Sequence, residues 1–312
     1  MNQKYIMFAE SSPGPKYMSK GWECQDKSVQ SEFKDVQIIA VADGHGSSDC
    51  FRSEYGAEAA TLAAQHVIGK YSKILRNSKE TLNISESTIK KIIFLIWEKW
   101  KEIVENHWIQ KGKPSEEELR YRDVSEKYKK RYCSNDEEIV KNYLYTAYGT
   151  TLLIAVSLPL YILIMQIGDG SCAVLHHDGL FSLPVPIEEV NQVNITTSLC
   201  ENNAYLKFRH VIIDRNIKNS RSPIAVFLST DGVDDCFPVY KNEEYLYKFY
   251  TNIIESIVTS GYKETFNELK NDTLPGLTST ASQDDISLAF FIDSNIEMVS
   301  EAFLNVKREH NR

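Results

Sequence analysis

The most restrictive feature of the sequence is an almost unbroken apolar stretch that runs from Thr150 to Ile167. Its length is close to the ~20 residues that a membrane-spanning helix needs. The tripeptide Ser157-Leu158-Pro159 in its middle is a turn signal, however, and each flank has the length and the composition of a β-strand. We therefore predict two buried antiparallel strands here, with a membrane helix as the alternative, and we expect no membrane association.

Apolar periodicity predicts most of the other elements. After an irregular first segment, we expect strands at residues 36–42, 172–176, 181–183, 211–213, 224–228 and 285–292, and helices at 55–71, 89–104, 245–258 and the C-terminal end. The strands between residues 150 and 228 read as one antiparallel meander. Repeats, low-complexity tracts and linkers are absent from the sequence, so we predict one α+β domain over residues 1–312.

The net charge of the chain indicates which kinds of partner it can bind. The chain has 35 Lys and Arg against 43 Asp and Glu, a net charge of -8, so we expect no nucleic acid to bind it. Residues 111–141 carry nine basic and eight acidic side chains and few large apolar ones. We interpret this stretch as a charged insertion in contact with solvent, helical or mobile, with a partner-docking surface as the alternative.

Six cysteines are scattered along the chain without a Cys-x-x-Cys pair. Because the sequence also starts without a secretory leader, we expect reduced, mostly buried thiols in a cytoplasmic protein.

Aspartates recur at the ends of the predicted strands. Asp43-Gly44, Asp231-Gly232 and Gly168-Asp169-Gly170 follow apolar runs, and Asp284-Asp285 precedes one. A single Asp-Gly pair is usually only a turn, but four such sites suggest that the carboxylates converge on one edge of a sheet. Carboxylates this close repel one another unless a cation lies between them, and ligands that are all oxygen favour Mg²⁺ or Mn²⁺. His45, two residues after Asp43, adds an imidazole to the same loop.

In their order and spacing, six segments resemble the metal-dependent protein phosphatase family, the protein phosphatase 2C-like serine/threonine phosphatases, and the first of them looks most like bacterial members. The segments span nearly the whole chain: residues 21–26 (GWECQD), 41–46 (VADGHG), 148–151 (YGTT), 167–171 (IGDGS), 228–235 (LSTDGVDD) and 282–287 (SQDDIS). The resemblance implies a four-layer α/β/β/α sandwich, in which two central antiparallel sheets are flanked by helices and two metal ions bind at one end.

The resemblance also implies roles for single residues. Asp43 would bridge two Mn²⁺ or Mg²⁺ ions, with Asp231 and Asp284 completing the first site and the Gly44 carbonyl the second. Asp26 would lie near the second ion, and Asp169 and Asp235 match positions that hold a third, more weakly bound ion in some members. His45 matches the proposed general acid that protonates the leaving serine or threonine oxygen. The attacking group would be a water held between the two ions, so the chain needs no nucleophile of its own.

The sequence departs from the family pattern where substrate phosphate is bound. Many members have an arginine five residues before the first aspartate, where this chain has Gly21. Lys20 and Arg52 are the phosphate-binding candidates, each with an ordinary solvated or ion-paired role as its alternative. Gln25 in place of a glutamate removes a charge near the second ion, and Asp285 in place of an asparagine adds one.

We therefore predict a monomeric phosphatase that hydrolyses phosphoserine and phosphothreonine in proteins, including the substrates of a cognate Ser/Thr kinase. A catalytically impaired regulatory or binding module with the same fold is one alternative, although such a module has no physical need for an uncompensated carboxylate cluster. A hydrolase of small phosphate esters is the other.

Overall fold

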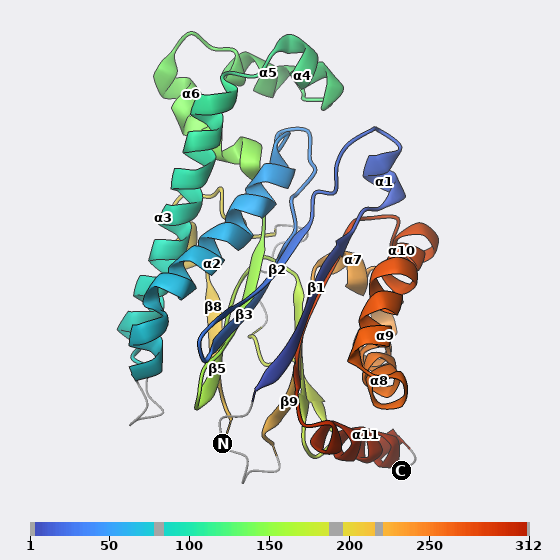
Figure 1. The fold of residues 1–312 in the computed structure, drawn as a ribbon. Helices are drawn as coiled ribbons and strands as arrows, with labels where there is room; N and C mark the ends of the chain where they lie inside the picture. The colour runs from blue at the N-terminus through green and yellow to red at the C-terminus, as the bar shows by residue number, and fades with distance from the viewer. Residues whose placement is uncertain (1–3, 78–83, 187–195, 216–220, 311–312) are drawn as a thin grey trace.

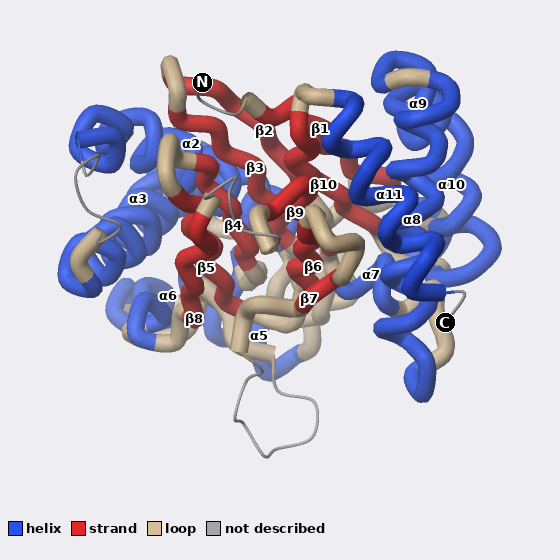
Figure 2. Tube along the Cα trace, turned by 90° about the horizontal axis from the view of Figure 1, so that it is seen from below, coloured by secondary structure: helices blue, strands red, loops and turns tan. Residues whose placement is uncertain are grey.

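Two antiparallel β-sheets face each other in the computed structural model, and helices cover both outer faces (Figures 1 and 2). The structure describes residues 4–77, 84–186, 196–215 and 221–310. The α+β sandwich predicted from the sequence is confirmed. Among the described residues, the structure contains no helix that is both long enough and apolar enough to cross a membrane.

Within the part of the chain that the structure describes, each sheet has five strands, and the two sheets share the chain in an interleaved order. The first sheet has the order β2 (Lys27–Phe33), β3 (Val36–Ala42), β4 (Leu152–Ser157), β5 (Tyr161–Ile167), β8 (Arg209–Asp214). The second has the order β1 (Tyr5–Ser12), β10 (Ile286–Asp293), β9 (Pro223–Ser229), β6 (Ser171–His176), β7 (Phe181–Ser182). The long apolar stretch forms the β4–β5 hairpin, in register from Leu152↔Ile167 to Ser157↔Ile162, as predicted.

The central strands are apolar throughout because both of their faces are buried. In β3, Ile39 and Val41 pack between the two sheets, whereas Ile38 and Ala40 pack against the helices. Strand β10 alternates in the same way between the two cores. This two-sided burial gives each strand a fixed register, since a slip by one residue would exchange its two faces.

Helices form the two outer layers. The first sheet is covered by α2 (Ser53–Asn77) and α3 (Glu86–Lys111), and the second by α8 (Asn242–Ser260), α9 (Tyr262–Glu268), α10 (Leu274–Leu277) and α11 (Ile296–His310) (Figure 2). The hydroxyl of Ser85 caps α3 by accepting from the Thr88 amide at 3.2 Å. Trp100 is fully buried and donates its indole N–H to the Gly56 carbonyl at 3.0 Å, while Trp97 is only partly buried.

Two predictions about the strands were wrong. The first residues are not irregular, because they form β1, the short helix α1 (Pro15–Met18) and β2. Both strands lie at sheet edges and are only partly buried, so their sequences lack a continuous apolar run. The predicted single meander is instead divided between the sheets, since the chain leaves the first sheet after β5 and enters the second at β6. Gly168 allows this change of direction with a φ of 100°.

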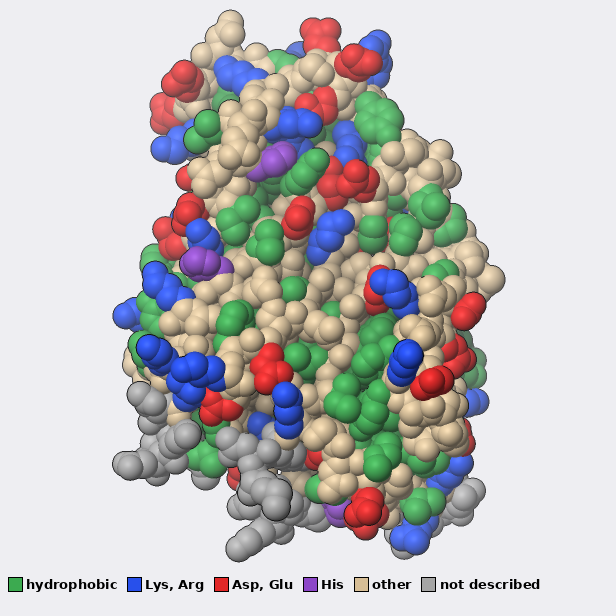
Figure 3. Space-filling view, viewed as in Figure 1, with side chains coloured by type: hydrophobic (Ala, Val, Ile, Leu, Met, Phe, Trp, Pro, Cys, Tyr) green, Lys and Arg blue, Asp and Glu red, His purple; other side chains and the backbone are tan. Residues whose placement is uncertain are grey.

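The charged insertion is helical. It consists of α4 (Glu116–Tyr121), α5 (Glu126–Tyr132) and α6 (Glu137–Leu144), which lie at the same end of the molecule as α1 (Figure 1). Acidic and basic side chains are mixed over its visible surface, as the sequence predicts for a segment in contact with solvent (Figure 3).

The six cysteines are free thiols. Only Cys50 and Cys172 are buried, Cys133 is exposed, and the other three are intermediate, so the expectation of mostly buried thiols was too strong.

The packing of α2 makes a testable prediction. A Cβ at Gly56 would lie 2.0 Å from the Tyr148 carbonyl oxygen, whereas a Cβ at the helical Gly276 would have no neighbour within 4 Å. We expect Gly56→Ala to lower the free energy of unfolding by about 1–3 kcal/mol through overpacking, as measured by urea denaturation. Gly276→Ala, the matched control, should be neutral or stabilising. Equal effects of the two substitutions would contradict this account of the packing.

Candidate metal centre

Three carboxylates meet at one end of the sandwich. Oxygen atoms of Asp43, Asp169 and Asp231 all lie within 4.8 Å of one another. Asp43 follows β3, Asp169 lies in the β5–β6 connection, and Asp231 begins the short helix α7 (Asp231–Asp234) after β9. Each aspartate therefore follows the last residues of a buried strand, and the stacking of the two sheets brings these strand ends together.

The electrostatics of this group favour a bound cation. Burial, followed by the charge of Asp169, raises the pKa of Asp43 to about 7. Burial, followed by the charge of Asp43, raises the pKa of Asp231 to about 8. Such shifts mean that the ionised carboxylates are unfavourable by themselves. A divalent ion removes the penalty, and ligands that are all oxygen fit Mg²⁺ or Mn²⁺, so the residues present fit the metal that the sequence predicts.

Asp26 lies beside Asp43. The two side chains share a hydrogen bond, and the Asp26 carboxylate also accepts from the Thr230 hydroxyl at 2.6 Å. Burial, with the charge of Asp43 second, raises the pKa of Asp26 well above its usual value. The structure thus brings this predicted residue into contact with the three-carboxylate group.

The remaining predicted carboxylates have other neighbours. Asp284 Oδ2 accepts from Lys16 Nζ at 2.6 Å, although its charge still contributes to the raised pKa values of Asp43 and Asp231. Asp235 is exposed. Asp285 is buried and accepts from the backbone amides of Gly14, at 2.7 Å, and Gln25. The carboxylate of Asp285 therefore links the loops that contain Gly14 and Gln25 to the start of β10.

Gly44 and Gln25 explain how closely the loops pack. A Cβ at Gly44 would lie 2.7 Å from the carbonyl oxygens of both Gln25 and Ser53, so only glycine fits. The buried Gln25 amide accepts from the Ser53 hydroxyl at 2.7 Å. Gln25 thus connects the loop that carries Asp26 to the start of α2.

Threonine hydroxyls position the carboxylate-bearing backbone. Thr151 Oγ1 accepts from the Asp43 amide at 3.0 Å, and Thr150 Oγ1 donates to the Asp43 carbonyl at 2.8 Å. The hydroxyl of Thr196 donates to the Asp169 carboxylate, and Thr197 Oγ1 accepts from the Gly168 amide at 3.0 Å. We did not predict Thr196 and Thr197, because no strand end or motif marks them in the sequence.

His45 lies on the same loop as Asp43. Its amide donates to the Gly149 carbonyl at 3.2 Å, and a Cβ at Gly149 would lie 2.8 Å from the imidazole Cδ2. Burial lowers the pKa of His45, while Asp169 opposes that shift. The imidazole is therefore within the electrostatic influence of Asp169 and packed against Gly149.

The helical insertion is anchored to the loops on both sides of this centre. The Tyr121 hydroxyl donates to the Gly21 carbonyl at 2.6 Å, and the Tyr132 hydroxyl donates to the Asp49 carbonyl at 2.9 Å. Arg122 of the insertion forms an ion pair with Glu54, which is buried at the start of α2. The insertion therefore holds the segments that precede Asp26 and follow His45.

The two predicted phosphate ligands have partners outside the carboxylate group. Lys20 is exposed, and its ammonium group lies 4.5 Å from the centre of the Trp22 ring. Arg52 is buried, with Nε 2.9 Å from Glu118 Oε1 and Nη2 3.1 Å from Glu118 Oε2. This bidentate pair disfavours Arg52 as a phosphate ligand, because its donors hold the insertion instead.

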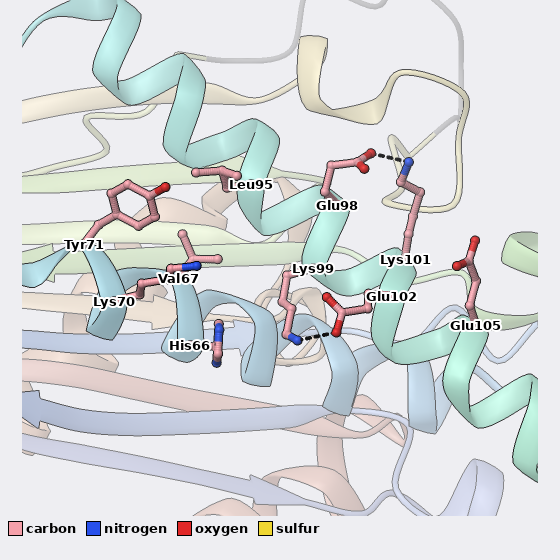
Figure 4. Close-up of a pocket in the computed structure, with 10 residues that line it drawn as sticks. All are labelled: His66, Val67, Lys70, Tyr71, Leu95, Glu98, Lys99, Lys101, Glu102 and Glu105. Carbon is pink, nitrogen blue, oxygen red and sulfur yellow. Dashed lines mark hydrogen bonds and ion pairs between the residues drawn. The ribbon is translucent and has the colours of Figure 1, made fainter.

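A groove lies between α2 and α3 (Figure 4). It has a volume of about 550 Å³, and four of its charged side chains form the ion pairs Lys99–Glu102, at 2.7 Å, and Lys101–Glu98. None of the predicted site residues lines this groove, so we place the candidate site at the carboxylate group.

Comparison with known proteins agrees with the geometry. A model of the family described as protein phosphatase 2C matches residues 13–270. The chain belongs to the protein phosphatase 2C family. A search of curated proteins finds no match.

Several solved structures are similar to this member of the protein phosphatase 2C family. The serine/threonine phosphatase Stp1 from Staphylococcus aureus is 14% identical with a TM-score of 0.51, over 95% of this chain and 97% of that chain. A serine/threonine phosphatase from S. agalactiae is 14% identical with a TM-score of 0.51, over 93% and 100%. PppA, a regulatory component of T6SS in Pseudomonas aeruginosa, is 10% identical with a TM-score of 0.51, over 93% and 97%. At these identities the likeness shows the shared fold.

The raised carboxylate pKa values predict how metal binding depends on pH. Below about pH 7, Asp43 and Asp231 keep protons in the folded state that a metal must displace, whereas above pH 8 they are ionised and repel each other. Because the folded pKa values are raised, these two groups destabilise the metal-free fold increasingly as pH rises from about 4 to 8. Mg²⁺ should therefore raise the melting temperature of chelator-treated protein more at pH 8.5 than at pH 6.

Differential scanning fluorimetry at the two pH values tests this prediction. Asp231→Asn should reduce both the pH dependence of the metal-free protein and the response to Mg²⁺. Asp272→Asn, an exposed site outside the group, is the control and should behave as the native chain. A response to Mg²⁺ that does not change with pH would contradict the role of the shifted carboxylates.

Proposed function

We propose that this member of the protein phosphatase 2C family hydrolyses phosphoserine and phosphothreonine monoesters in proteins at the end of the sandwich where Asp43, Asp169 and Asp231 meet. The observation that carries the proposal is the mutual approach of these carboxylates within 4.8 Å. We further propose phosphoproteins, including substrates of a cognate Ser/Thr kinase, as its partners, a cytoplasmic location and a monomeric state.

The proposed metal content follows from the same residues. Two Mg²⁺ or Mn²⁺ ions, when bound, supply water activation and charge neutralisation for hydrolysis of the phosphate ester. Asp43 would contact both ions, with Asp231 and Asp284 as further ligands of one and the Gly44 carbonyl of the other, near Asp26. Asp169 and Asp235 would hold a third, weaker ion. The contact of Asp169 with Asp43 and Asp231 supports the participation of Asp169.

The other residues of the centre position these ligands and handle the proton. Thr150 and Thr151 fix the backbone of Asp43 from both sides, so the carboxylate is held before substrate arrives. His45, in the loop packed against Gly149, is the proposed donor of a proton to the leaving oxygen. No Ser or Cys nucleophile is needed in this scheme.

An impaired binding module is the less favoured alternative. A module without catalysis would gain nothing from burying carboxylates whose ionised forms are as unfavourable as those of Asp43 and Asp231. A hydrolase of small phosphate esters remains as an outcome of the first test below.

Removal of one proposed ligand tests the activity. We expect the native chain to hydrolyse p-nitrophenyl phosphate and a phosphothreonine peptide with Mn²⁺ and to lose both activities with chelator. Asp231→Asn should lower kcat/KM by about 100-fold or more, since even residues that only support metal ligands cost 10–100-fold. Asp272→Asn should retain activity. No metal-dependent turnover by the native chain would overturn the enzyme, and turnover of only the small ester would favour the small-molecule hydrolase.

The role of His45 is tested by the leaving group. The alkoxide of phosphothreonine needs a proton far more than p-nitrophenolate does, and general acids typically contribute 10²–10⁴-fold. We expect His45→Ala to lower kcat for the peptide by about 100-fold or more and to affect p-nitrophenyl phosphate much less. Equal losses on the two substrates would remove the proton-donor role.

A further inference from the structure

A charge-assisted hydrogen bond from a lysine or an arginine would strengthen the binding of a phosphate monoester that approaches this group of carboxylates. The lysine and arginine side chains of the segments at residues 14–26 and 43–53 are those of Lys16, Lys20 and Arg52, and they are in different environments. Lys20 lies over the ring of Trp22, and Arg52 is committed to Glu118. Of the three, only Lys16 forms an ion pair with a proposed metal ligand, because its Nζ lies 2.6 Å from Asp284 Oδ2.

The structure around Gly21 explains why this chain has no basic side chain at position 21 to bind phosphate. Its φ is 72°, which disfavours any residue with a side chain, and a Cβ would lie 2.9 Å from the Tyr121 hydroxyl oxygen. Tyr121 belongs to the helical insertion and donates to the Gly21 carbonyl. The insertion thus occupies the space that a long side chain at position 21 would need.

The backbone around Lys16 is held against the segment that precedes β10. The Lys16 amide donates to the Gln283 carbonyl at 3.1 Å, and the Gly14 amide donates to Asp285 Oδ1 at 2.7 Å. A Cβ at Gly14 would lie 2.3 Å from the backbone of Asp284, so the two segments are in direct contact. These contacts place the base of the Lys16 side chain next to the ligand-bearing loop before β10.

Tyr17 fixes α1 from the opposite side. Its ring is buried and stacks on Trp22 with 5.9 Å between ring centres. Its hydroxyl lies against Gly46, where a Cβ would be 2.2 Å away. The short segment that carries Lys16 is therefore held between the loop that contains His45 and the loop that contains Asp284. The side chain of Lys16 itself is half exposed to solvent.

We propose that Lys16 is a substrate-binding residue whose ammonium group contacts an oxygen of the substrate phosphate. The inference rests on the proposed function. When a divalent ion neutralises Asp284, the ammonium group of Lys16 no longer has to balance that carboxylate and is available to the phosphate. The exposed position of the side chain lets it reach a phosphate that enters from solvent. The opposing possibility is that Lys16 serves only as a counter-ion for Asp284.

Binding of inorganic phosphate to the Mg²⁺-loaded full-length protein tests this proposal without requiring turnover. We expect Lys16→Gln to weaken phosphate binding by about 10-fold in isothermal titration calorimetry, with Lys16→Arg retaining most of the affinity. Lys90→Gln is the matched control, because it also removes an exposed lysine–glutamate pair, at 3.2 Å from Glu86, on α3. It should bind phosphate as the native chain does.

Two further measurements separate the two roles of Lys16. With the phosphothreonine peptide, Lys16→Gln should raise KM about 10-fold and change kcat less. A counter-ion role instead predicts tighter Mg²⁺ binding in Lys16→Gln with unchanged phosphate affinity, and that result would overturn the proposal. A loss of phosphate binding in Lys20→Gln but not in Lys16→Gln would overturn it as well. If the native chain shows no turnover, the proposed function fails, whereas the phosphate titration still decides the role of Lys16.

Discussion

Repulsion among clustered carboxylates is the constraint to which the rest of this structure responds. Asp43, Asp169 and Asp231 follow strands whose positions are set by two apolar cores, so the fold itself brings these carboxylates together. Around them the chain uses mainly neutral hydroxyl groups, as in the bonds from Thr230 to Asp26 and from Thr196 to Asp169. Hydroxyls orient a carboxylate without cancelling its charge, which leaves that charge for a metal.

The helical insertion uses its charges differently from what the sequence suggests. Its composition is that of a surface segment, yet Arg122 reaches a buried glutamate and Glu118 receives the buried Arg52. Together with Tyr121 and Tyr132, these contacts join the insertion to both loops of the centre. The insertion is thereby fixed to the segments on both sides of the carboxylate group.

The central part of the fold could be predicted from the sequence because strands such as β3 and β5 are buried on both faces and read as apolar runs. Edge strands such as β2 carry no such signal, since only one face is covered. The candidate site residues differ in the same way in how far the sequence predicts them. Asp43 and Asp169 stand at the ends of apolar runs and could be found, whereas the pairing of Lys16 with Asp284 joins residues 268 positions apart and depends on how α1 packs. Local patterns contain no information on such a contact.

Strand β10 lies at the centre of its sheet, with β1 on one side and β9 on the other, although it is the last strand to be synthesised. During translation, β1 and β9 therefore emerge from the ribosome long before the strand that joins them. Until then both present unpaired edges that can pair with other chains. Asp284, which we propose as a metal ligand, lies just before β10. Neither this sheet nor the proposed ligand set is therefore complete until residues 284–293 have been made.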